Sequence, residues 1–103
     1  MMAAIGQLYQ RMRRLMNLKQ EDVARLVGVR RPTISDWETG QQVIKVENMR
    51  AMNKVLRVPD RTAIDLARHG NVPDDIVTEL VRMIHRGEDP TVEEAMRSLG
   101  YSV

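Results

Sequence analysis

The sequence predicts an all-α domain, and three observations favour that fold class. Aromatic residues make up only 3% of the 103 residues, and runs of strand-forming residues are absent. Met, Leu, Ala, Arg and Glu are abundant, and all of them are good helix formers. Apolar residues recur at the spacing of one helix face. A chain of this length is expected to build about one domain around one hydrophobic core.

The first expected helix lies before Asn17 and is amphipathic. Its apolar residues fall at i, i+3, i+7 and i+10, which places them on one face: Ile5, Leu8, Met12 and Leu15. The pattern breaks from Asn17 to Lys19, and a second short helix is expected to begin near Gln20. The buried side of that helix is predicted to consist of Val23, Leu26 and Val27.

The stretch from residue 20 to residue 40 indicates two helices joined by a tight turn, the arrangement of a helix-turn-helix motif. Ala24 is small enough to let the second helix cross the first closely, and Gly28 suits the turn. Pro32 falls in the first turn of the second helix, where proline is tolerated. Gly40 is placed to end that helix in a left-handed conformation.

The second motif helix has an apolar side and a polar side. Ile34 and Trp37 lie three residues apart and are expected to point inward. Base stacking by Trp37 is the alternative, but a groove-binding helix does not need it. The polar side is expected to be exposed and to carry Arg30, Arg31, Thr33 and Asp36.

Four further helices are expected after the loop 41–45. The apolar positions that predict them are, in order, Val46, Met49, Met52 and Leu56; Ile64 and Ala67; Ile76, Leu80 and Met83 or Ile84; and Val92, Ala95, Met96 and Leu99. Pro59 closes the first of these helices and Gly70 the second, while Pro73 opens the third. Thr91 and Glu94 have the spacing of a capping box at the start of the last.

Charge is distributed unevenly along the chain. Residues 1–58 contain 11 Lys and Arg against 5 Asp and Glu, a net charge of +6. Residues 59–103 contain 5 against 9, a net charge of −4. This asymmetry favours a polyanion as the partner of the first part, with chance segregation of charge on a solvated surface as the alternative.

Several classes of function find no support in the sequence. The absence of cysteine excludes disulfides and Cys-based metal or redox chemistry. Residues 1–20 contain no apolar run long enough for a signal peptide or a membrane span, so we expect a cytoplasmic protein. His69 and His85 lack metalloprotease spacing, and there is no nucleophile motif or glycine-rich phosphate loop. We expect neither an enzyme nor a metal or cofactor.

In four longer segments, the sequence resembles the helix-turn-helix family of phage Cro and repressor proteins, also called XRE-like or Cro/C1-type regulators. The resemblance covers roughly residues 8–58. Four segments carry it: LKQEDVA at 18–24, LVGV at 26–29, TISDWETG at 33–40 and VENM at 46–49.

The resemblance implies a lambda-repressor-like bundle of about five helices that binds operator DNA as a two-fold dimer. The second motif helix would enter the major groove, where four residues would meet base edges or neighbouring phosphates: Arg30, Arg31, Thr33 and Asp36. Phosphates would be contacted by Gln20 and by three loop residues: Gln41, Gln42 and Lys45. The resemblance also pairs Glu38 with Arg13 on the first helix.

For four of these residues we expect a more specific contact or effect. Arg31 is our first choice for a bidentate contact with guanine, worth about 1 to 3 kcal/mol of discrimination. Asp36 either accepts a hydrogen bond from cytosine N4 or orients Arg31 or Arg30 through a salt bridge. Lys19 and Lys45 replace the family's usual Ser, Thr or Asn caps, which removes a side-chain acceptor worth about 1 kcal/mol from each helix start. Both lysines add positive charge where phosphates would lie.

We therefore predict a sequence-specific regulator of transcription that binds double-stranded DNA, acting as a repressor and a homodimer on an operator. Residues 1–58 would form the DNA-binding domain, and residues 59–103 would dimerise, pack onto it or bind a protein partner. Two alternatives stay open: an antitoxin-type autoregulator whose C-terminal helices bind a protein partner, and an interaction scaffold without DNA binding. The expected location is the bacterial nucleoid or a phage-infected host's cytoplasm, with no membrane involved.

Overall fold

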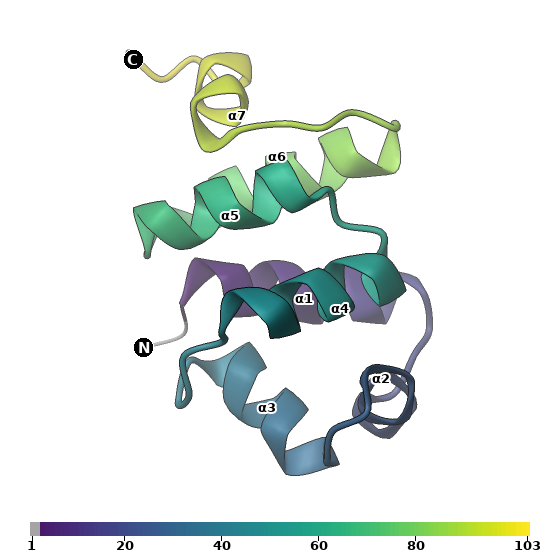
Figure 1. Cartoon of the computed structure of the whole chain (residues 1–103). Helices are drawn as coiled ribbons and strands as arrows, with labels where there is room; N and C mark the ends of the chain where they lie inside the picture. The colour runs from purple at the N-terminus through teal and green to yellow at the C-terminus, as the bar shows by residue number, and fades with distance from the viewer. Residues whose placement is uncertain (1–2) are drawn as a thin grey trace.

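Seven α-helices and no strand make up residues 3–103, the range that the computed structural model describes (Figure 1). The helices are α1 (Ala4–Leu15), α2 (Gln20–Val27), α3 (Arg31–Thr39), α4 (Val46–Leu56), α5 (Asp60–His69), α6 (Asp74–His85) and α7 (Val92–Ser98). The predicted all-α fold is confirmed, with α2 and α3 as the two motif helices and three helices after α4.

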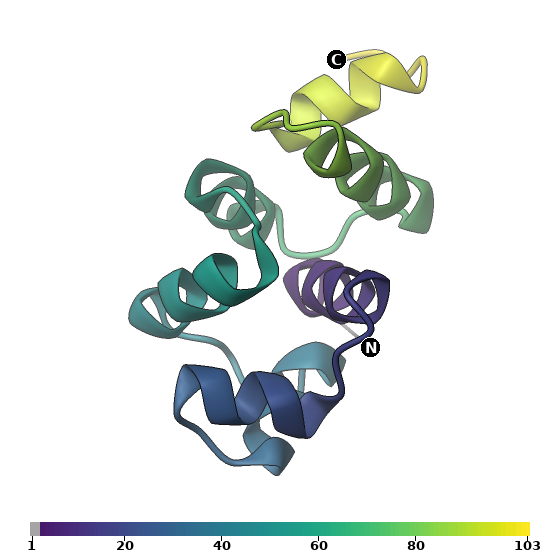
Figure 2. The same ribbon diagram turned by 90° about the vertical axis from the view of Figure 1, so that its right-hand side faces the viewer.

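The first helix, α1, lies at the centre of the molecule, with α2 and α3 on one side and α5 and α6 on the other (Figures 1 and 2). Leu8 and Tyr9 of α1 are fully buried. Gly6 faces α3 so closely that a Cβ atom there would collide with the carbonyl oxygens of Trp37 and Glu38. Only glycine fits this position, so α1 and the end of α3 are held in direct backbone contact.

A polar chain inside the bundle joins α1 to α4 and α5. The Tyr9 hydroxyl donates a hydrogen bond to Asn53 Oδ1 at 2.7 Å, and Asn53 Nδ2 donates to Asp60 Oδ1 at 2.8 Å. Burial, assisted by the negative charge of Asp60, raises the pKa of Tyr9 far above its ordinary value. The hydroxyl therefore keeps its proton and remains a hydrogen-bond donor at neutral pH.

The C-terminal helices pack onto the rest of the molecule through the same core. Helix α6 contacts α1 and α7, and α5 contacts α1, α4 and α7. One buried apolar cluster extends from Ala4 to Ala95. Thr62 Oγ1 in α5 also donates to the Pro90 carbonyl oxygen at 2.6 Å, just before α7. These contacts support intramolecular packing of residues 59–103, whereas the boundary at residue 58 and a role in dimerisation stay predictions.

Several helix ends were predicted correctly from residues close to them in sequence. Thr91 and Glu94 form the predicted capping box, in which the Glu94 amide donates to Thr91 Oγ1 at 3.2 Å and the Thr91 amide donates to Glu94 Oε1 at 3.0 Å. Helix α6 begins directly after Pro73, as predicted. Helix α4 ends at Leu56, where Arg57 takes a left-handed conformation with φ 59°.

Apolar periodicity was wrong for five residues that it predicts to be buried, all of which are exposed: Leu15, Leu26, Val46, Ala67 and Leu99. Leu15 ends α1, Val46 begins α4, and Leu99 follows the end of α7. Neighbouring helices cover only part of a side chain at such an end, which explains these three.

The other two residues, Leu26 and Ala67, lie in helix interiors, and their exposure has a different cause. On α2 the buried arc contains Val23 and Ala24, because α3 crosses there, and this turns Leu26 toward solvent. On α5 the buried arc contains Ala63 and Leu66, so Ala67 lies outside it and Ile64 is only half-buried. The helical spacing of apolar residues was predicted correctly for both helices, but the neighbouring helix determines which of these residues it covers.

Candidate DNA-binding site

The turn between α2 and α3 has the geometry that the motif requires. Gly28 ends α2 with φ 88°, a left-handed value that favours glycine, and the amides of Gly28 and Val29 both donate to the Ala24 carbonyl oxygen at 2.8 and 2.9 Å. Ala24 itself is buried, so α3 can lie close to α2. The predicted structural roles of Ala24 and Gly28 therefore match the observed turn.

One side of helix α3 packs in the core, and the other side is accessible to solvent. Ile34 and Trp37 are buried in the core, which places Trp37 inside the bundle and not at a stacking surface. Arg31 and Pro32 lie in the exposed first turn, and Gly40 ends the helix with φ 79°. Figures 1 and 2 show α2 and α3 together at one end of the molecule, remote from α7. The N-terminal end of α3 is thus free to meet a ligand.

A buried ion pair fixes α3 against the end of α1. Arg13 Nε donates to Glu38 Oε2 at 2.6 Å and a terminal Arg13 nitrogen donates to Glu38 Oε1 at 3.0 Å. The side chains are 10% and 0% exposed, respectively, and Arg13 also donates to the Leu18 carbonyl oxygen at 2.9 Å. The pairing that the resemblance implies is therefore present, in the bidentate form that gives arginine–carboxylate pairs their geometric definition.

Gln20 extends this ion pair to the surface of α3. Its Nε2 donates to Glu38 Oε1 at 3.0 Å, while its Oε1 accepts a hydrogen bond from an Arg31 terminal nitrogen at 3.2 Å. Four side chains thus form a continuous path from the buried end of α1 to the exposed start of α3. We call Arg13, Glu38, Gln20 and Arg31 the core-to-surface network.

The double role of Gln20 was missed by sequence reasoning, which assigned it to a phosphate. The amide side chain offers a donor and an acceptor at once, which is the only signal the residue type gives. Its partners lie 11 and 18 residues away in sequence. No helical spacing connects residues at such separations, so the contact becomes visible only in the folded chain.

The structure of residues 3–103 shows no contact through which Asp36 would orient an arginine, and this role stays a prediction. Within residues 3–103 its carboxylate makes no ion pair with Arg30 or Arg31. Asp36 follows Arg31 by five residues, and side chains meet along a helix at separations of three or four, so it lies on a different side. Arg31 is oriented by Gln20 instead. Arg30 is exposed, and Thr33 and Asp36 are half-buried.

The remaining candidates surround this end of the molecule as exposed side chains: Lys19, Gln41, Gln42 and Lys45. Lys19 has no side-chain acceptor, and Asp22 completes only half of a capping box by accepting from the Lys19 amide at 2.8 Å. Two hydrogen bonds lower the pKa of Asp22: the one from Arg25 has the larger effect, and the one from the Lys19 amide has the next largest. Lys45 precedes α4 without a side-chain cap, and both lysines are exposed residues.

The fold and the site together define a helix-turn-helix protein whose second motif helix carries an exposed arginine at its start. A family model of Cro/C1-type helix-turn-helix proteins matches residues 10–62, from α1 to the start of α5 and just over half of the chain. The chain therefore belongs to that family and is a DNA-binding regulator of transcription. The family is regulatory and not typically enzymatic. No curated protein matches the chain.

Residues 3–103 contain neither a membrane-spanning helix nor a metal-binding cluster. None of the helices there has the length and apolar character needed to span a membrane. No three His, Asp or Glu side chains in that range are grouped as metal ligands. His69 and His85 are exposed, and they lie on different helices, α5 and α6.

Proposed function

We propose that this chain is a sequence-specific repressor that binds operator DNA as a homodimer, with α3 in the major groove. The observation that carries the proposal is Arg31, which is exposed in the first turn of α3 and already oriented by Gln20. In helix-turn-helix proteins the N-terminal residues of the second helix contact base edges. A guanidinium held in place before binding loses less conformational entropy when it pairs with guanine O6 and N7.

The other polar residues at this end of the molecule would contact bases and the DNA backbone. Arg30 and Thr33 adjoin Arg31 and would meet bases or neighbouring phosphates, and Asp36, which has no cationic partner on α3, would accept from cytosine N4. Four residues at the starts of helices and in the loop after α3 would meet phosphates: Lys19, Gln41, Gln42 and Lys45. The net charge of +6 in residues 1–58 supports this assignment.

The proposed dimer and the proposed repression are supported by the way in which helix-turn-helix proteins bind their operators. A two-fold dimer places two recognition helices in successive major grooves, about 34 Å apart along the duplex. Repression needs only that the operator be occupied, so it requires no further surface on the protein.

Selection from random double-stranded DNA, followed by the mass of the complex, tests the proposal. We expect an enriched sequence with two-fold symmetry, bound by two copies of the chain. The affinity should fall with rising salt, because each neutralised phosphate contributes about −0.9 to the slope of log K against log salt concentration. Selection of no sequence, or of an asymmetric one bound by one copy, would contradict the proposed operator binding. An affinity independent of salt would contradict duplex DNA as the ligand.

A further inference from the structure

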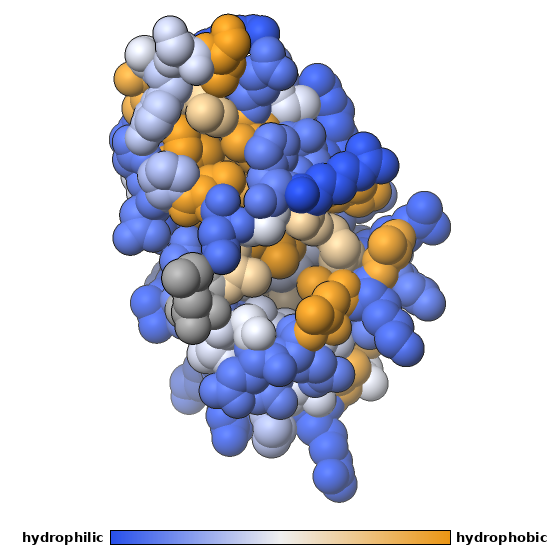
Figure 3. All heavy atoms as spheres, turned by 90° about the vertical axis from the view of Figure 1, so that its left-hand side faces the viewer, coloured by the Kyte–Doolittle hydropathy of each residue, from blue (hydrophilic) through white to orange (hydrophobic). Residues whose placement is uncertain are grey.

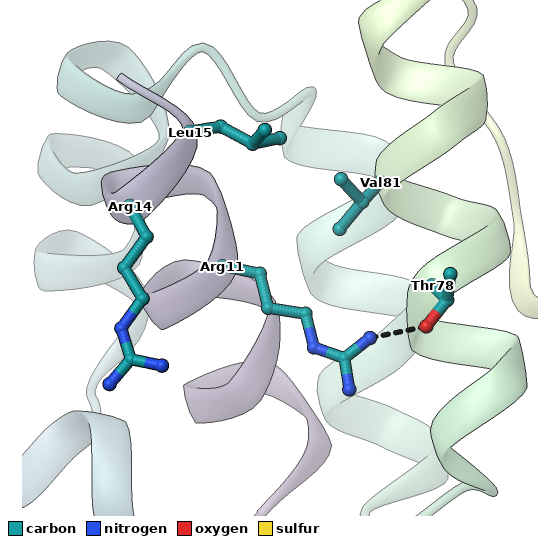
Figure 4. A pocket seen from close by; sticks show the side chains of 5 residues that line it. All are labelled: Arg11, Arg14, Leu15, Thr78 and Val81. Carbon is teal, nitrogen blue, oxygen red and sulfur yellow. Dashed lines mark hydrogen bonds between the residues drawn. The ribbon is translucent and has the colours of Figure 1, made fainter. Parts of the chain in front are cut away.

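A shallow trough lies between α1 and α6, on the side of the molecule away from α2 and α3. Its first part is a cavity of about 370 Å³ lined by Arg11, Arg14, Leu15, Thr78 and Val81 (Figure 4). Figure 4 shows Leu15 and Val81 pointing into the gap between the two helices, and Arg11 reaching across to donate a hydrogen bond to Thr78.

The trough continues beyond this first cavity in two directions. A second cavity shares Leu15, Thr78 and Val81 and adds Arg82 and His85. A third shares Leu15 and His85 and reaches Arg57, with a floor of four apolar side chains: Met12, Met16, Leu56 and Ile84. Because Leu15 lines all three, we treat them as one surface, the α1–α6 trough.

The floor of the trough exposes apolar surface that the fold does not cover. Leu15 is 56% exposed although it continues the apolar face of Leu8 and Met12, which are buried. Val81 is only half-buried. Covering such side chains with another apolar surface is favourable by roughly 25 cal/mol for each Å² removed from water.

The rim of the trough carries positive charge only. The charged or titratable residues that line its three cavities are Arg11, Arg14, Arg57, Arg82 and His85, without one carboxylate among them. Among these five residues, only Arg82 has an acidic partner within residues 3–103, namely Glu79 at 2.5 Å. Arg14 and Arg57 are exposed and make no ion pair there. An occupant of this trough must therefore bring apolar surface and negative charge together.

The charge and shape of the trough favour one kind of occupant over two others. A second copy packed by two-fold symmetry would place the same arginines against each other, which like-charge repulsion opposes. The trough is shallow and open along the C-terminal parts of α1 and α6, which suits a short helix better than an enclosed small molecule. We propose that the α1–α6 trough docks an amphipathic helix of another protein, whose apolar stripe covers Leu15 and Val81 and whose flanking Asp and Glu residues pair with Arg14, Arg57 and Arg82.

The site is independent of DNA binding. Figures 1 and 2 place α6 on the side of α1 opposite α2 and α3, so the recognition helix stays accessible when the trough is filled. The exposed apolar residue Val43, 87% exposed, provides a matched control elsewhere. It lies in the loop between α3 and α4, which is at the left of Figure 1. Figure 3 faces that side of the molecule and shows apolar patches among hydrophilic ones.

Peptide selection on the full chain tests the inference. A phage-displayed library of helical peptides about as long as the 12-residue α6 would be selected on the unmodified chain and then rescreened on Leu15→Ser and Val43→Ser. We expect a class of peptides that binds the Val43→Ser variant normally and the Leu15→Ser variant about tenfold more weakly. These peptides should carry apolar residues at i, i+3, i+4 and i+7, with Asp and Glu beside them. Arg14→Glu should weaken them further and favour peptides with Lys in place of Glu.

Other results would overturn the proposal. Selected peptides that lose no affinity on Leu15→Ser, or Leu15-dependent peptides without excess Asp and Glu, would show that the trough does not recognise an acidic helix. Concentration-dependent NMR shifts of the Leu15 and Val81 methyl groups in the chain alone would show that a second copy occupies it. Circular dichroism of each variant separates loss of binding from loss of folding. A failure here would leave DNA selection by the same chain unchanged.

Discussion

Arg31 leaves the first turn of α3 with its guanidinium already hydrogen-bonded to Gln20 Oε1. We expect Arg31→Ala to weaken operator binding by about 1 to 3 kcal/mol and to relax the preference at one base position, because a bidentate contact with guanine would be lost. The measurements are a binding titration and a repeated DNA selection. Arg68→Ala on α5, which removes another exposed arginine away from the site, should change neither. An unaltered base preference in Arg31→Ala would exclude the base-reading role.

Gln20 is the residue through which Arg31 is oriented, and a double-mutant cycle separates this role from direct phosphate contact. Gln20→Met keeps the length of the side chain but removes its donor and acceptor. We expect it to weaken DNA binding by about 1 kcal/mol when Arg31 is present and by less in Arg31→Ala, with a coupling energy between about 0.5 and 1 kcal/mol. Equal losses in both backgrounds would mean that Gln20 acts on the DNA by itself.

At the scale of secondary structure, the Arg13–Glu38 pair holds the end of α1 to α3. Removing one partner leaves a buried charge without compensation, so Arg13→Met should lower the free energy of unfolding by about 3 to 5 kcal/mol. The double variant Arg13→Met, Glu38→Leu removes both charges and should recover part of that loss. Urea denaturation of four proteins gives the comparison: the unmodified chain, Arg13→Met, Glu38→Leu and the double variant. A double variant as unstable as the sum of the two single variants would show that the charges do not interact.

The capping box of α7 permits a second prediction at this scale. Thr91→Ala removes the acceptor of the Glu94 amide and should lower the free energy of unfolding by about 1 kcal/mol. Ser102→Ala, a comparable loss of an exposed hydroxyl beyond the end of α7, is the control. Both would be measured by urea denaturation. If the two variants are equally stable, the Thr91 cap contributes nothing to the fold.

For the whole molecule, the question is whether the C-terminal helices unfold with the DNA-binding helices. Leu80 of α6 is fully buried, and Trp37, the only tryptophan, lies in α3. We expect Leu80→Ala to lower the free energy of unfolding by about 2 to 5 kcal/mol and to shift the Trp37 fluorescence transition together with the loss of helix. Leu26→Ala, the same change at an exposed position, should cost under about 0.5 kcal/mol. An unshifted Trp37 transition in Leu80→Ala would support separate units divided at residue 58.

The fold was predictable from the sequence where a signal is local. Gly28, Gly40 and the Thr91–Glu94 pair act within one helix turn, and each ends or begins a helix as predicted. The seven helices themselves follow from the spacing of apolar residues. The exposure of Leu26 was not predictable in this way, because it depends on the side from which α3 crosses α2.

The candidate site was predictable in its location but not in its internal contacts. The segment around α2 and α3 was identified from its residues, and Ile34 and Trp37 are buried as expected. The contacts of Gln20 join α2 to both ends of α3 and have no period in the sequence. The trough likewise combines α1 with α6, two helices separated by most of the chain, so only the folded molecule brings Leu15 beside Val81.

The core-to-surface network also constrains how this protein can change during evolution. A substitution of Arg31 alters the surroundings of Gln20, and a substitution of Gln20 alters those of the buried Glu38, so these positions are expected to change together. Within residues 3–103, the side chains of Arg30 and Thr33 form no hydrogen bond or ion pair with the network. New operator preferences can therefore arise at these two positions while the packing of the bundle is retained, which separates the adaptable part of the recognition surface from its fixed part.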